Sequence, residues 1–418
     1  MKQTKFPGTT STNRLSHLFT FIAVIAISAT ACKKGVADKP AASDEDKRSG
    51  ITEATQTHTY TKIFDGGTDG YHSFRIPSIV RTNANTLIAF VEGRMGSNKD
   101  YGNINVEYKR STDNGANWSD MMEVVGAGQV TWGNPTAVVD RNTGRIWVFM
   151  SWNSATKNQG GTDGYEKIDT WGDRRVYSSY SDDDGLTFST PVDMTSTLLP
   201  PGRIWDAMGP GVGIQTSNGT LVIPAIGRNI YSTDHGATWQ YKTIPGGTSE
   251  GAIVELMDGR LMRNDRPTTA SWETAKRRWV SRGTITGTFS AFAPDDVLLD
   301  PTCQGSIVRY TGTPDRIMVL NPASTIKENR FKMRVRISYD GGVTWPLSRK
   351  IYDWLTDDEA YAQGKGGYSS MVKTADYTIG ALIEVNENTG ANGTSHRSIE
   401  FHKFNLPWMV DGNTEPIP

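Results

Sequence analysis

The sequence predicts an all-β protein, a six-bladed β-propeller, and three observations support this fold class. A short Ser-x-Asp-x-Gly-x-x-aromatic box occurs four times, and a turn followed by an apolar strand occurs six times. Glycine supplies 43 of the 418 residues, above its usual share of about 7%, and there are 12 Trp and 15 Tyr. This mixture favours many short strands joined by tight turns.

The four boxes span Ser111–Trp118, Ser181–Phe188, Ser232–Trp239 and Ser338–Trp345. In each box the Asp is expected to bond its own backbone and the Gly to adopt a positive φ, which makes a hairpin turn. The aromatic residue that ends the box is expected to pack the hairpin onto its neighbour. These are Asp boxes, and we predict that they act as turns and take no part in catalysis.

The number of blades follows from the second repeat. Its six units are marked by the first aliphatic residue of each strand, namely Leu87, Ile146, Leu221, Leu261, Ile317 and Ile379. The spacings are 59, 75, 40, 56 and 62 residues, and strand units recurring at this period indicate a propeller. We therefore predict six blades over residues 60–418, with the Asp box missing or degenerate in two of them.

Residues 1–31 are predicted to be a signal peptide. Basic residues come first, and an apolar stretch over 18–29 follows that is too short for a comfortable membrane span. Small residues directly before Cys32 resemble a bacterial lipoprotein cleavage site. We therefore predict a lipidated Cys32, a disordered tether over 32–59, and an exported lipoprotein of the outer membrane or periplasm. Ordinary cleavage to a soluble secreted or periplasmic protein is the alternative.

Lipidation of Cys32 is tested by labelling with a fatty-acid analogue. Cys32→Ala is expected to abolish the label, because the cysteine carries the acyl chains. Equal labelling of the wild type and the variant, or no label in either, would contradict the prediction. Cys303 is the other cysteine of the chain, so no internal disulfide is expected.

Charge and histidine usage exclude several classes of partner. The chain has 44 Lys and Arg against 45 Asp and Glu, a net charge of −1, which gives no field for holding nucleic acid or an anionic membrane. Contact with a membrane is expected only through the lipid anchor, and the protein is expected to be a monomer. The six histidines show no metal-ligand spacing, so neither a metal nor another cofactor is predicted.

Alternating strand direction places one group of polar residues at one end of the propeller, opposite the Asp boxes. That end holds the start of each first strand, the end of each second strand and the start of each third strand. The polar residues there are Arg75, Arg94, Asp100, Glu250, Arg266, Arg330, Tyr368 and Glu384. Arg330 directly precedes the third strand of the fifth blade, which is expected over residues 331–338. Arginines from separate blades predict an anionic ligand, because a guanidinium pairs with a carboxylate through two charge-assisted hydrogen bonds. A Tyr beside a Glu indicates a nucleophile and its base, and Asp100 on the rim fits a general acid.

Phe74-Arg75-Ile76-Pro77 looks like the Phe-Arg-Ile-Pro signature of sialidases. Together with the Asp boxes it resembles bacterial exo-sialidases of glycoside hydrolase family 33, over residues 60–408. The resemblance implies a sialidase-type propeller as the catalytic domain. It further implies an exo-α-sialidase that releases terminal sialic acids from glycoproteins, glycolipids and oligosaccharides with retention of configuration.

The resemblance also implies a role for each polar residue of the predicted site. Tyr368 would be the nucleophile, Glu250 its base and Asp100 the acid/base. Arg75, Arg266 and Arg330 would form the triad that holds the carboxylate of the sialic acid. Arg94 would be a further arginine near the sugar's O4. Glu384 would be the carboxylate that orients Arg75. Arg263 and Arg334 are the rivals for the second and third places of the triad. Trp132, Trp152 and Trp205 line the N-acetyl and glycerol pockets or, as the equal alternative, pack in the core.

Three other functions stay open at this point. A trans-sialidase or intramolecular trans-sialidase would use the same residues, because the acceptor site is built by loops. A non-catalytic glycan-binding propeller predicts a broken nucleophile or acid, yet Tyr368, Glu250 and Asp100 are all present. An Asp-box enzyme acting on neutral glycans would not need a clamp for a carboxylate.

Overall fold

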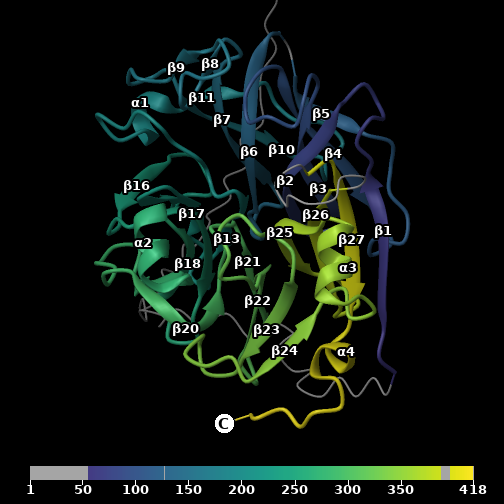
Figure 1. The fold of residues 1–418 in the computed structure, drawn as a ribbon. Helices are drawn as coiled ribbons and strands as arrows, with labels where there is room; N and C mark the ends of the chain where they lie inside the picture. Colours follow the sequence, from purple (N-terminus) through teal and green to yellow (C-terminus); the bar gives the residue numbers. More distant parts are fainter. Residues whose placement is uncertain (1–54, 127, 387–395, 418) are drawn as a thin grey trace, which may run out of the picture. The chain divides into compact units, whose positions relative to one another are not determined.

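The computed structural model describes residues 55–126, 128–386 and 396–417. The predicted signal peptide, Cys32 and most of the expected tether lie outside the described residues. The described chain forms 27 strands and four short helices (Figure 1), which confirms the all-β prediction. In these residues, no helix has the length and the apolar character that a membrane crossing requires.

The strands form six four-stranded antiparallel blades. From the channel outward, blade 1 consists of β2 (Ser73–Arg81), β3 (Leu87–Arg94), β4 (Ile104–Ser111) and β5 (Met122–Val125), and blade 2 of β6 (Val130–Val139), β7 (Ile146–Ser154), β10 (Arg175–Ser181) and β11 (Val192–Asp193). In the same order, blade 3 consists of β13 (Ile214–Gln215), β14 (Leu221–Ala225), β15 (Arg228–Ser232) and β16 (Gln240–Thr243), and blade 4 of β17 (Thr248–Glu255), β18 (Leu261–Pro267), β19 (Arg277–Gly283) and β20 (Ala293–Leu299). Blade 5 consists of β21 (Ser306–Thr311), β22 (Arg316–Pro322), β23 (Met333–Ser338) and β24 (Leu347–Lys350), and blade 6 of β25 (Lys365–Lys373), β26 (Ile379–Val385), β27 (Ser398–Phe404) and β1 (His58–Phe64). One parallel pairing, Ile104 with Thr131, joins blades 1 and 2 into a single sheet.

The innermost strands β2, β6, β13, β17, β21 and β25 contact one another in a closed ring around a central channel (Figure 1). The six predicted turn-strand units become the second strands β3, β7, β14, β18, β22 and β26. The remaining elements lie in the connections: β8 (Lys157–Asn158), β9 (Glu166–Lys167), β12 (Gly211–Val212), α1 (Thr195–Leu198), α2 (Thr269–Ala275), α3 (Asp357–Ala362) and α4 (Leu406–Val410). The fold is therefore a six-bladed propeller, as predicted.

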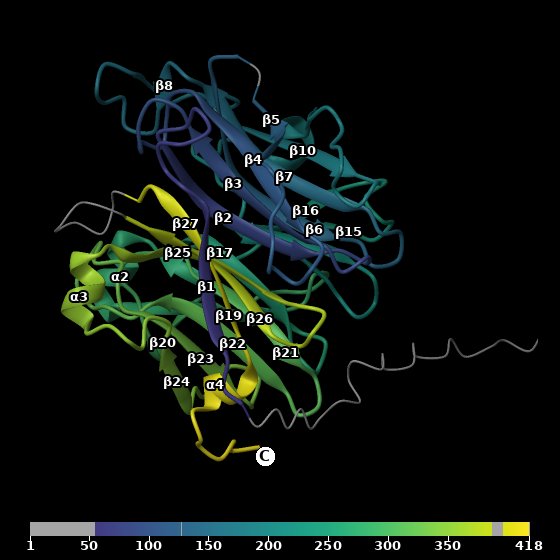
Figure 2. The ribbon, with the colours of Figure 1, turned by 90° about the vertical axis from the view of Figure 1, so that its right-hand side faces the viewer.

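Blade 6 is built from both ends of the described chain. Strand β1 pairs antiparallel with β27, so the first described strand completes the sheet that the last three strands begin (Figure 2). Strand β1 starts at His58, close to the expected domain boundary at residue 60.

Each Asp box fastens its blade to the preceding one. In the first box, Ser111 Oγ donates to Asp113 Oδ1 (2.8 Å), and the amide of Gly115 donates to Ser111 Oγ (2.8 Å). Gly115 has a φ of +86°, and a Cβ there would lie 2.2 Å from the Phe401 ring of blade 6, so only glycine fits. Trp118 then packs edge-on against Phe401. The box thus supplies both the turn and the contact between blades.

Blades 4 and 6 lack the box for different reasons. In blade 6 the third and fourth strands, β27 and β1, come from opposite ends of the chain, so no hairpin joins them. In blade 4 the connection between β19 and β20, residues 284–292, contains no Asp. The prediction that two blades lack a regular box is confirmed.

Candidate active site

A cavity of about 320 Å³ lies at the channel end opposite the Asp boxes. Seven of the predicted site residues line it: Arg75, Arg94, Asp100, Glu250, Arg266, Arg330 and Tyr368. The eighth, Glu384, lies directly behind Arg75 and bonds to it. Four blades contribute these side chains, because the cavity is framed by the ends of the inner strands and the loops beside them. The structure therefore brings the whole predicted group together.

The Tyr368 hydroxyl lies at the bottom of this cavity in contact with a carboxylate and a guanidinium. It donates to Glu250 Oε1 at 2.6 Å, and Arg266 Nη1 donates to both Tyr368 Oη and Glu250 Oε2 at 2.7 Å. Burial raises the pKa of Tyr368 well above its ordinary value, although the charge of Arg266 acts in the opposite direction. The phenol is therefore neutral, and Glu250 is placed to accept its proton.

Arg75 is held rigidly by Glu384. Its Nε and Nη2 donate to the two carboxylate oxygens at 3.0 and 3.1 Å, and the amides of Ile76 and Tyr368 donate to the same carboxylate at 2.8 and 2.9 Å. Ile76 has a φ of +57°, a strained value for a β-branched residue, at a bulge in β2. The Phe-Arg-Ile-Pro segment thus turns its backbone so that one carboxylate fixes the arginine and the adjoining strands.

The ion pair of Arg75 and Glu384 makes a prediction about acid stability. Burial acts to raise the pKa of Glu384, but the charge of Arg75 outweighs it and lowers the pKa to about 2. A carboxyl whose pKa is lower in the folded than in the unfolded state stabilises the fold above its unfolded pKa, and this stabilisation disappears as the pH falls toward 2. Glu384→Gln is therefore expected to lower the free energy of unfolding at pH 7 by about 3 kcal/mol.

Urea unfolding of the wild type and of Glu384→Gln, measured from pH 7 down to pH 3, checks this expectation. The difference between the two proteins should shrink as the pH falls. Glu166→Gln, on the exposed strand β9, is the matched control and should change little. A difference that stays constant over the whole range would mean that Glu384 stabilises the fold by shape and not by charge.

Asp100 lies on the open rim of the cavity, between two arginines. One of its carboxylate oxygens, Oδ1, is 2.8 Å from Arg94 Nη1 and 3.4 Å from Arg75 Nη1, while 72% of its side chain is exposed. Crowding by neighbouring protein atoms acts to raise the pKa of Asp100, but the charges of Arg94 and Arg75 outweigh it and hold the pKa below its ordinary range. Asp100 is therefore ionised beside these two arginines.

Arg266 and Arg330, which the resemblance favours for the carboxylate triad, line the cavity. Their rivals Arg263 and Arg334 do not. Arg330 is buried there, with its guanidinium 5.3 Å from the centre of the Tyr368 ring. Arg263 is buried elsewhere, in a bidentate pair with Asp265, and Arg334 lies within β23 outside the cavity lining. Strand β23 begins at Met333, whereas the sequence predicted residues 331–338, so Arg330 lies ahead of the strand on the loop that enters the cavity.

Arg330→Lys is expected to reduce kcat/KM on sialyllactose far more than Arg334→Lys. Lysine keeps the charge but loses the planar fork that pairs with a carboxylate, and one lost charged hydrogen bond corresponds to a factor of about ten or more. Steady-state kinetics of both variants measure this, and thermal unfolding verifies that both are folded. If Arg334→Lys is the more damaging, the third arginine of the clamp is misassigned.

The wall facing the arginine group contains residues that the sequence did not indicate. Arg174 donates from Nη2 to Asn134 Oδ1 (2.7 Å), and its guanidinium lies 4.5 Å from the centre of the Trp205 ring. Burial lowers the pKa of Arg174 to about 10. Gln159 completes this wall. The sequence held one signal for Asn134: it is followed by Pro135, as Ile76 is followed by Pro77 in blade 1. In the structure both residues have a positive φ, +55° for Asn134 and +57° for Ile76.

The three tryptophans considered for the sugar pockets separate into two groups. Trp205 lines the cavity. Trp132 and Trp152 pack against Tyr177 among the apolar residues between blades 1 and 2. Of these three tryptophans, Trp205 is therefore the one whose position allows contact with a ligand in the cavity.

A propeller fastened by Asp boxes places the chain in the class of BNR-repeat proteins, and the BNR repeat-like domain matches residues 83–382. The chain is 47% identical to an exo-alpha-sialidase of Aspergillus fumigatus over 82% of its own length and 86% of that protein. It is 45% identical to an exo-alpha-sialidase of Arthroderma benhamiae over 94% of its length and 97% of that protein. The solved structure of a Hadza microbial sialidase superposes with a TM-score of 0.70 at 27% identity, covering 84% of this chain and 69% of that one.

The chain belongs to the sialidase family of glycoside hydrolases. Both relatives with 45–47% identity are fungal, so a bacterial source stays a prediction.

Proposed function

We propose that the protein is an exo-α-sialidase that hydrolyses terminal sialic acids from glycoproteins, glycolipids and oligosaccharides. The observation that supports this most is the contact of the buried Tyr368 hydroxyl with Glu250 and Arg266, in a cavity that Arg75 and Arg330 also line. Sialic acid bears a carboxylate on its anomeric carbon, and three guanidinium groups from separate blades match that charge. The same carboxylate would repel an anionic nucleophile, whereas a neutral phenol avoids the repulsion.

In the first step Tyr368 Oη attacks the anomeric carbon and its proton passes to Glu250. Asp100 gives a proton to the glycosidic oxygen as the bond between that oxygen and the anomeric carbon breaks. In the second step a water molecule gives a proton to Asp100 and attacks the anomeric carbon. The bond to Tyr368 then breaks, and the phenol recovers its proton from Glu250. Two displacements at one carbon retain its configuration.

Asp100 needs a proton before the first step, yet Arg94 and Arg75 favour its ionised form. A substrate carboxylate that binds Arg75 competes for the same guanidinium and adds a negative charge nearby. Both effects raise the pKa of Asp100, because a nearby like charge disfavours the ionised form. Substrate binding thus favours the protonated acid that the first step consumes.

The products formed from the two sialyllactose isomers, followed by NMR, test the proposal. Hydrolysis with retention gives the α-anomer of free sialic acid first, and the anomers then equilibrate. A sialylated acceptor sugar as product would support a trans-sialidase, and a cyclised sialic acid an intramolecular trans-sialidase. Binding without any product would support a glycan-binding propeller.

A further inference from the structure

Asp100, the acid/base of the proposed mechanism, lies near the tip of the loop that joins β3 to β4, and this loop is irregular throughout. Hydrogen bonds hold its backbone on either side of the tip. Arg94 Nη1 donates to the carbonyl oxygen of Asn98 (2.5 Å), and Thr131 Oγ1 donates to that of Gly102 (2.7 Å). The segment between these two bonds, which carries Asp100, is held through its side chains.

Substrate binding weakens the contacts of the Asp100 side chain itself. Its Oδ1 lies beside Arg94 and Arg75, and in the proposed mechanism the substrate carboxylate takes up the guanidinium of Arg75. Protonation of Asp100, which the first step requires, removes the charge that attracts both arginines. A contact that keeps the acid in place during proton transfer therefore has to come from its neighbours on the loop.

The two residues that flank Asp100 both reach across to blade 2. Tyr101 Oη donates to Asp163 Oδ2, and Lys99 Nζ lies 3.7 Å from the same carboxylate oxygen. The ring of Tyr101 also packs against the ring of Tyr165, with 4.6 Å between the ring centres. We call this group of Lys99, Tyr101, Asp163 and Tyr165 the rim clip. It joins the loop that carries Asp100 to the loop between β8 and β9.

The blade 2 side of the rim clip is a turn that is already ordered by its own hydrogen bonds. Asn158, buried at the end of β8, accepts at Oδ1 from three successive amides, those of residues 160–162 (3.1, 2.6 and 3.1 Å). Its Nδ2 donates to the carbonyl oxygen of Thr162 (2.8 Å). Asp163 follows with a φ of +56°, a conformation that Asp tolerates better than most residues. The turn thus presents the Asp163 carboxylate to Tyr101 without help from a substrate.

The hydrogen bond of Tyr101 is the main contact of the rim clip. It raises the pKa of Tyr101 to about 12, so the phenol keeps its proton at neutral pH and stays a donor. The side chains of Lys99 and Asp163 are 57% and 56% exposed, and an ion pair so open to water contributes little.

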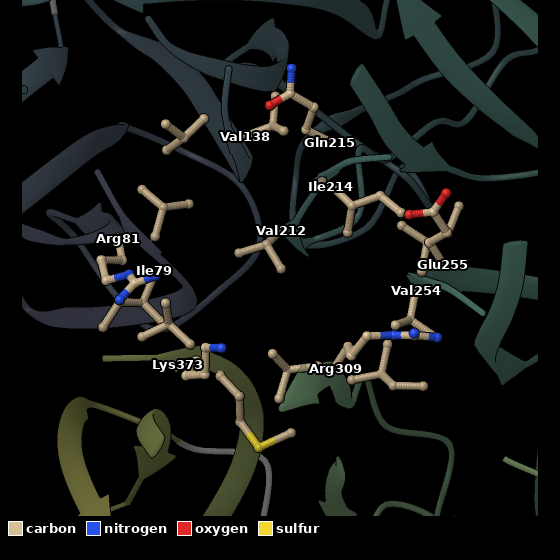
Figure 3. A pocket seen from close by; sticks show the side chains of 18 of the residues that line it. Ile79, Arg81, Val138, Val212, Ile214, Gln215, Val254, Glu255, Arg309 and Lys373 are labelled. Carbon is tan, nitrogen blue, oxygen red and sulfur yellow. The ribbon is translucent and has the colours of Figure 1, made fainter. Parts of the chain in front are cut away.

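The rim clip lies beside the space that a leaving sugar would occupy. An outer cavity of about 660 Å³ shares five lining residues with the active-site cavity: Arg75, Asp100, Gln159, Trp205 and Arg330. Tyr101 lines this outer cavity, whereas Asp163 does not. Another cavity, at the carboxyl ends of the inner strands (Figure 3), shares none of its described lining residues with the active-site cavity. The outer cavity is therefore the one that continues from the site, on the side of Asp100.

We propose that Tyr101 and Asp163 are positioning residues, whose hydrogen bond keeps Asp100 against the glycosidic oxygen while the substrate carboxylate occupies Arg75. This inference rests on the proposed function, in which Asp100 gives a proton to the leaving sugar. A proton donor has to stay within hydrogen-bond reach of its acceptor, and a small displacement of a reacting group slows the reaction. A substrate whose leaving group needs no proton should be insensitive to the rim clip.

Steady-state kinetics of Asp163→Ala and Tyr101→Phe on two substrates test the proposal. Each variant is expected to lower kcat/KM on sialyllactose about three- to tenfold, the effect of one lost hydrogen bond. On a nitrophenyl sialoside each should lose less than about twofold, because a phenolate leaves with little help from an acid. Equal losses on the two substrates, or no loss on sialyllactose in either variant, overturn the proposal. Thermal unfolding verifies that both variants are folded.

Two further variants serve as controls. Asp163→Asn keeps an oxygen that accepts from Tyr101 and should retain most of the activity that Asp163→Ala loses. Asp169→Ala removes another exposed carboxylate of the same blade, one that accepts from Thr170 Oγ1 (3.2 Å), and should leave both substrates unaffected. If Asp163→Asn is as slow as Asp163→Ala, the negative charge and not the hydrogen bond is responsible, and the proposal is wrong.

Asp163 also separates positioning from direct contact with the leaving sugar. Because Tyr101 lines the outer cavity and Asp163 does not, a direct contact of Tyr101 with the sugar would make Tyr101→Phe slow on sialyllactose and leave Asp163→Ala normal. That result overturns the positioning role.

Asp100→Asn distinguishes a failure of this inference from a failure of the proposed function. A leaving-group dependence in Asp100→Asn together with none in Asp163→Ala would reject the rim clip and keep the acid. No leaving-group dependence in Asp100→Asn would reject the acid, and the positioning role with it. In the Asp100→Asn background, Asp163→Ala should cause no further loss on sialyllactose, because no acid is left to position. Losses that multiply would overturn the proposal.

Discussion

Tyr368→Phe is expected to lower kcat on sialyllactose by at least about 10³-fold, because it removes the oxygen that we propose forms the covalent intermediate. The ring itself remains, and it packs against Ile76 and Cys303 in the floor of the cavity, so the fold should be preserved. Single-turnover and steady-state kinetics measure the loss, and thermal unfolding serves as the structural control. A variant that retains most of its activity would exclude Tyr368 as the nucleophile.

A double variant of Tyr368 and Glu250 tests whether the two residues act together. Tyr368 and Glu250 share one proton across 2.6 Å and are proposed to act as a unit, so their losses should not add. The double variant Tyr368→Phe/Glu250→Gln should therefore be about as slow as the worse single variant. If the two losses multiply, Glu250 acts on the substrate separately and is not the base for the phenol.

Asp100→Asn is expected to slow a natural sialoside by about 10²–10⁴-fold and a nitrophenyl sialoside much less. A sugar alkoxide leaves poorly without a proton, whereas a phenolate leaves with little help. Asparagine keeps the shape of the side chain but cannot supply the proton. The ratio of kcat/KM for sialyllactose to that for the aryl sialoside, in wild type and variant, measures the effect.

The control for Asp100 addresses its contacts with Arg94 and Arg75. If Asp100 only positions these arginines, Asp100→Asn should slow both substrates by the same factor, because both need the carboxylate clamp. Arg94→Lys is the matched variant: it disturbs the same contact while leaving the proton donor in place. It should impair both substrates alike. A leaving-group dependence in Asp100→Asn and none in Arg94→Lys is the expected pattern.

The fold could be predicted because each of its repeats is marked by a short, continuous sequence motif. An Asp box needs only an Asp, a Gly and an aromatic residue within eight positions, and a second strand shows as an apolar run after a turn. The order of the blades and the end that carries the polar group follow from strand direction. Arg75, Tyr368 and Glu250 lie on the inner strands β2, β25 and β17, so the strand pattern placed them.

Arg174 and Gln159 could not be predicted in this way, and the sequence left Trp205 undecided between the cavity and the core. Gln159 and Trp205 lie on long connections of blades 2 and 3, and contacts with other loops fix their positions, not strand periodicity. The start of β23 was misjudged for a related reason: Lys332 has a φ of +62°, which breaks the strand before Met333. Nothing in residues 331–338 signals that conformation.

The ring of six blades is complete only when β1 pairs with β27 in blade 6. His58 and His402 are joined by a 3.0 Å contact across 344 positions of sequence, so β1 leaves the ribosome long before its partner exists. Closing so long a loop is costly in entropy, and such non-local pairings form slowly. The strand pairings within blades 1 to 5 are more local, so we expect them to form before β1 pairs with β27. A chain truncated before residue 398 would leave β1 and the edge of β26 unpaired, and exposed strand edges promote aggregation.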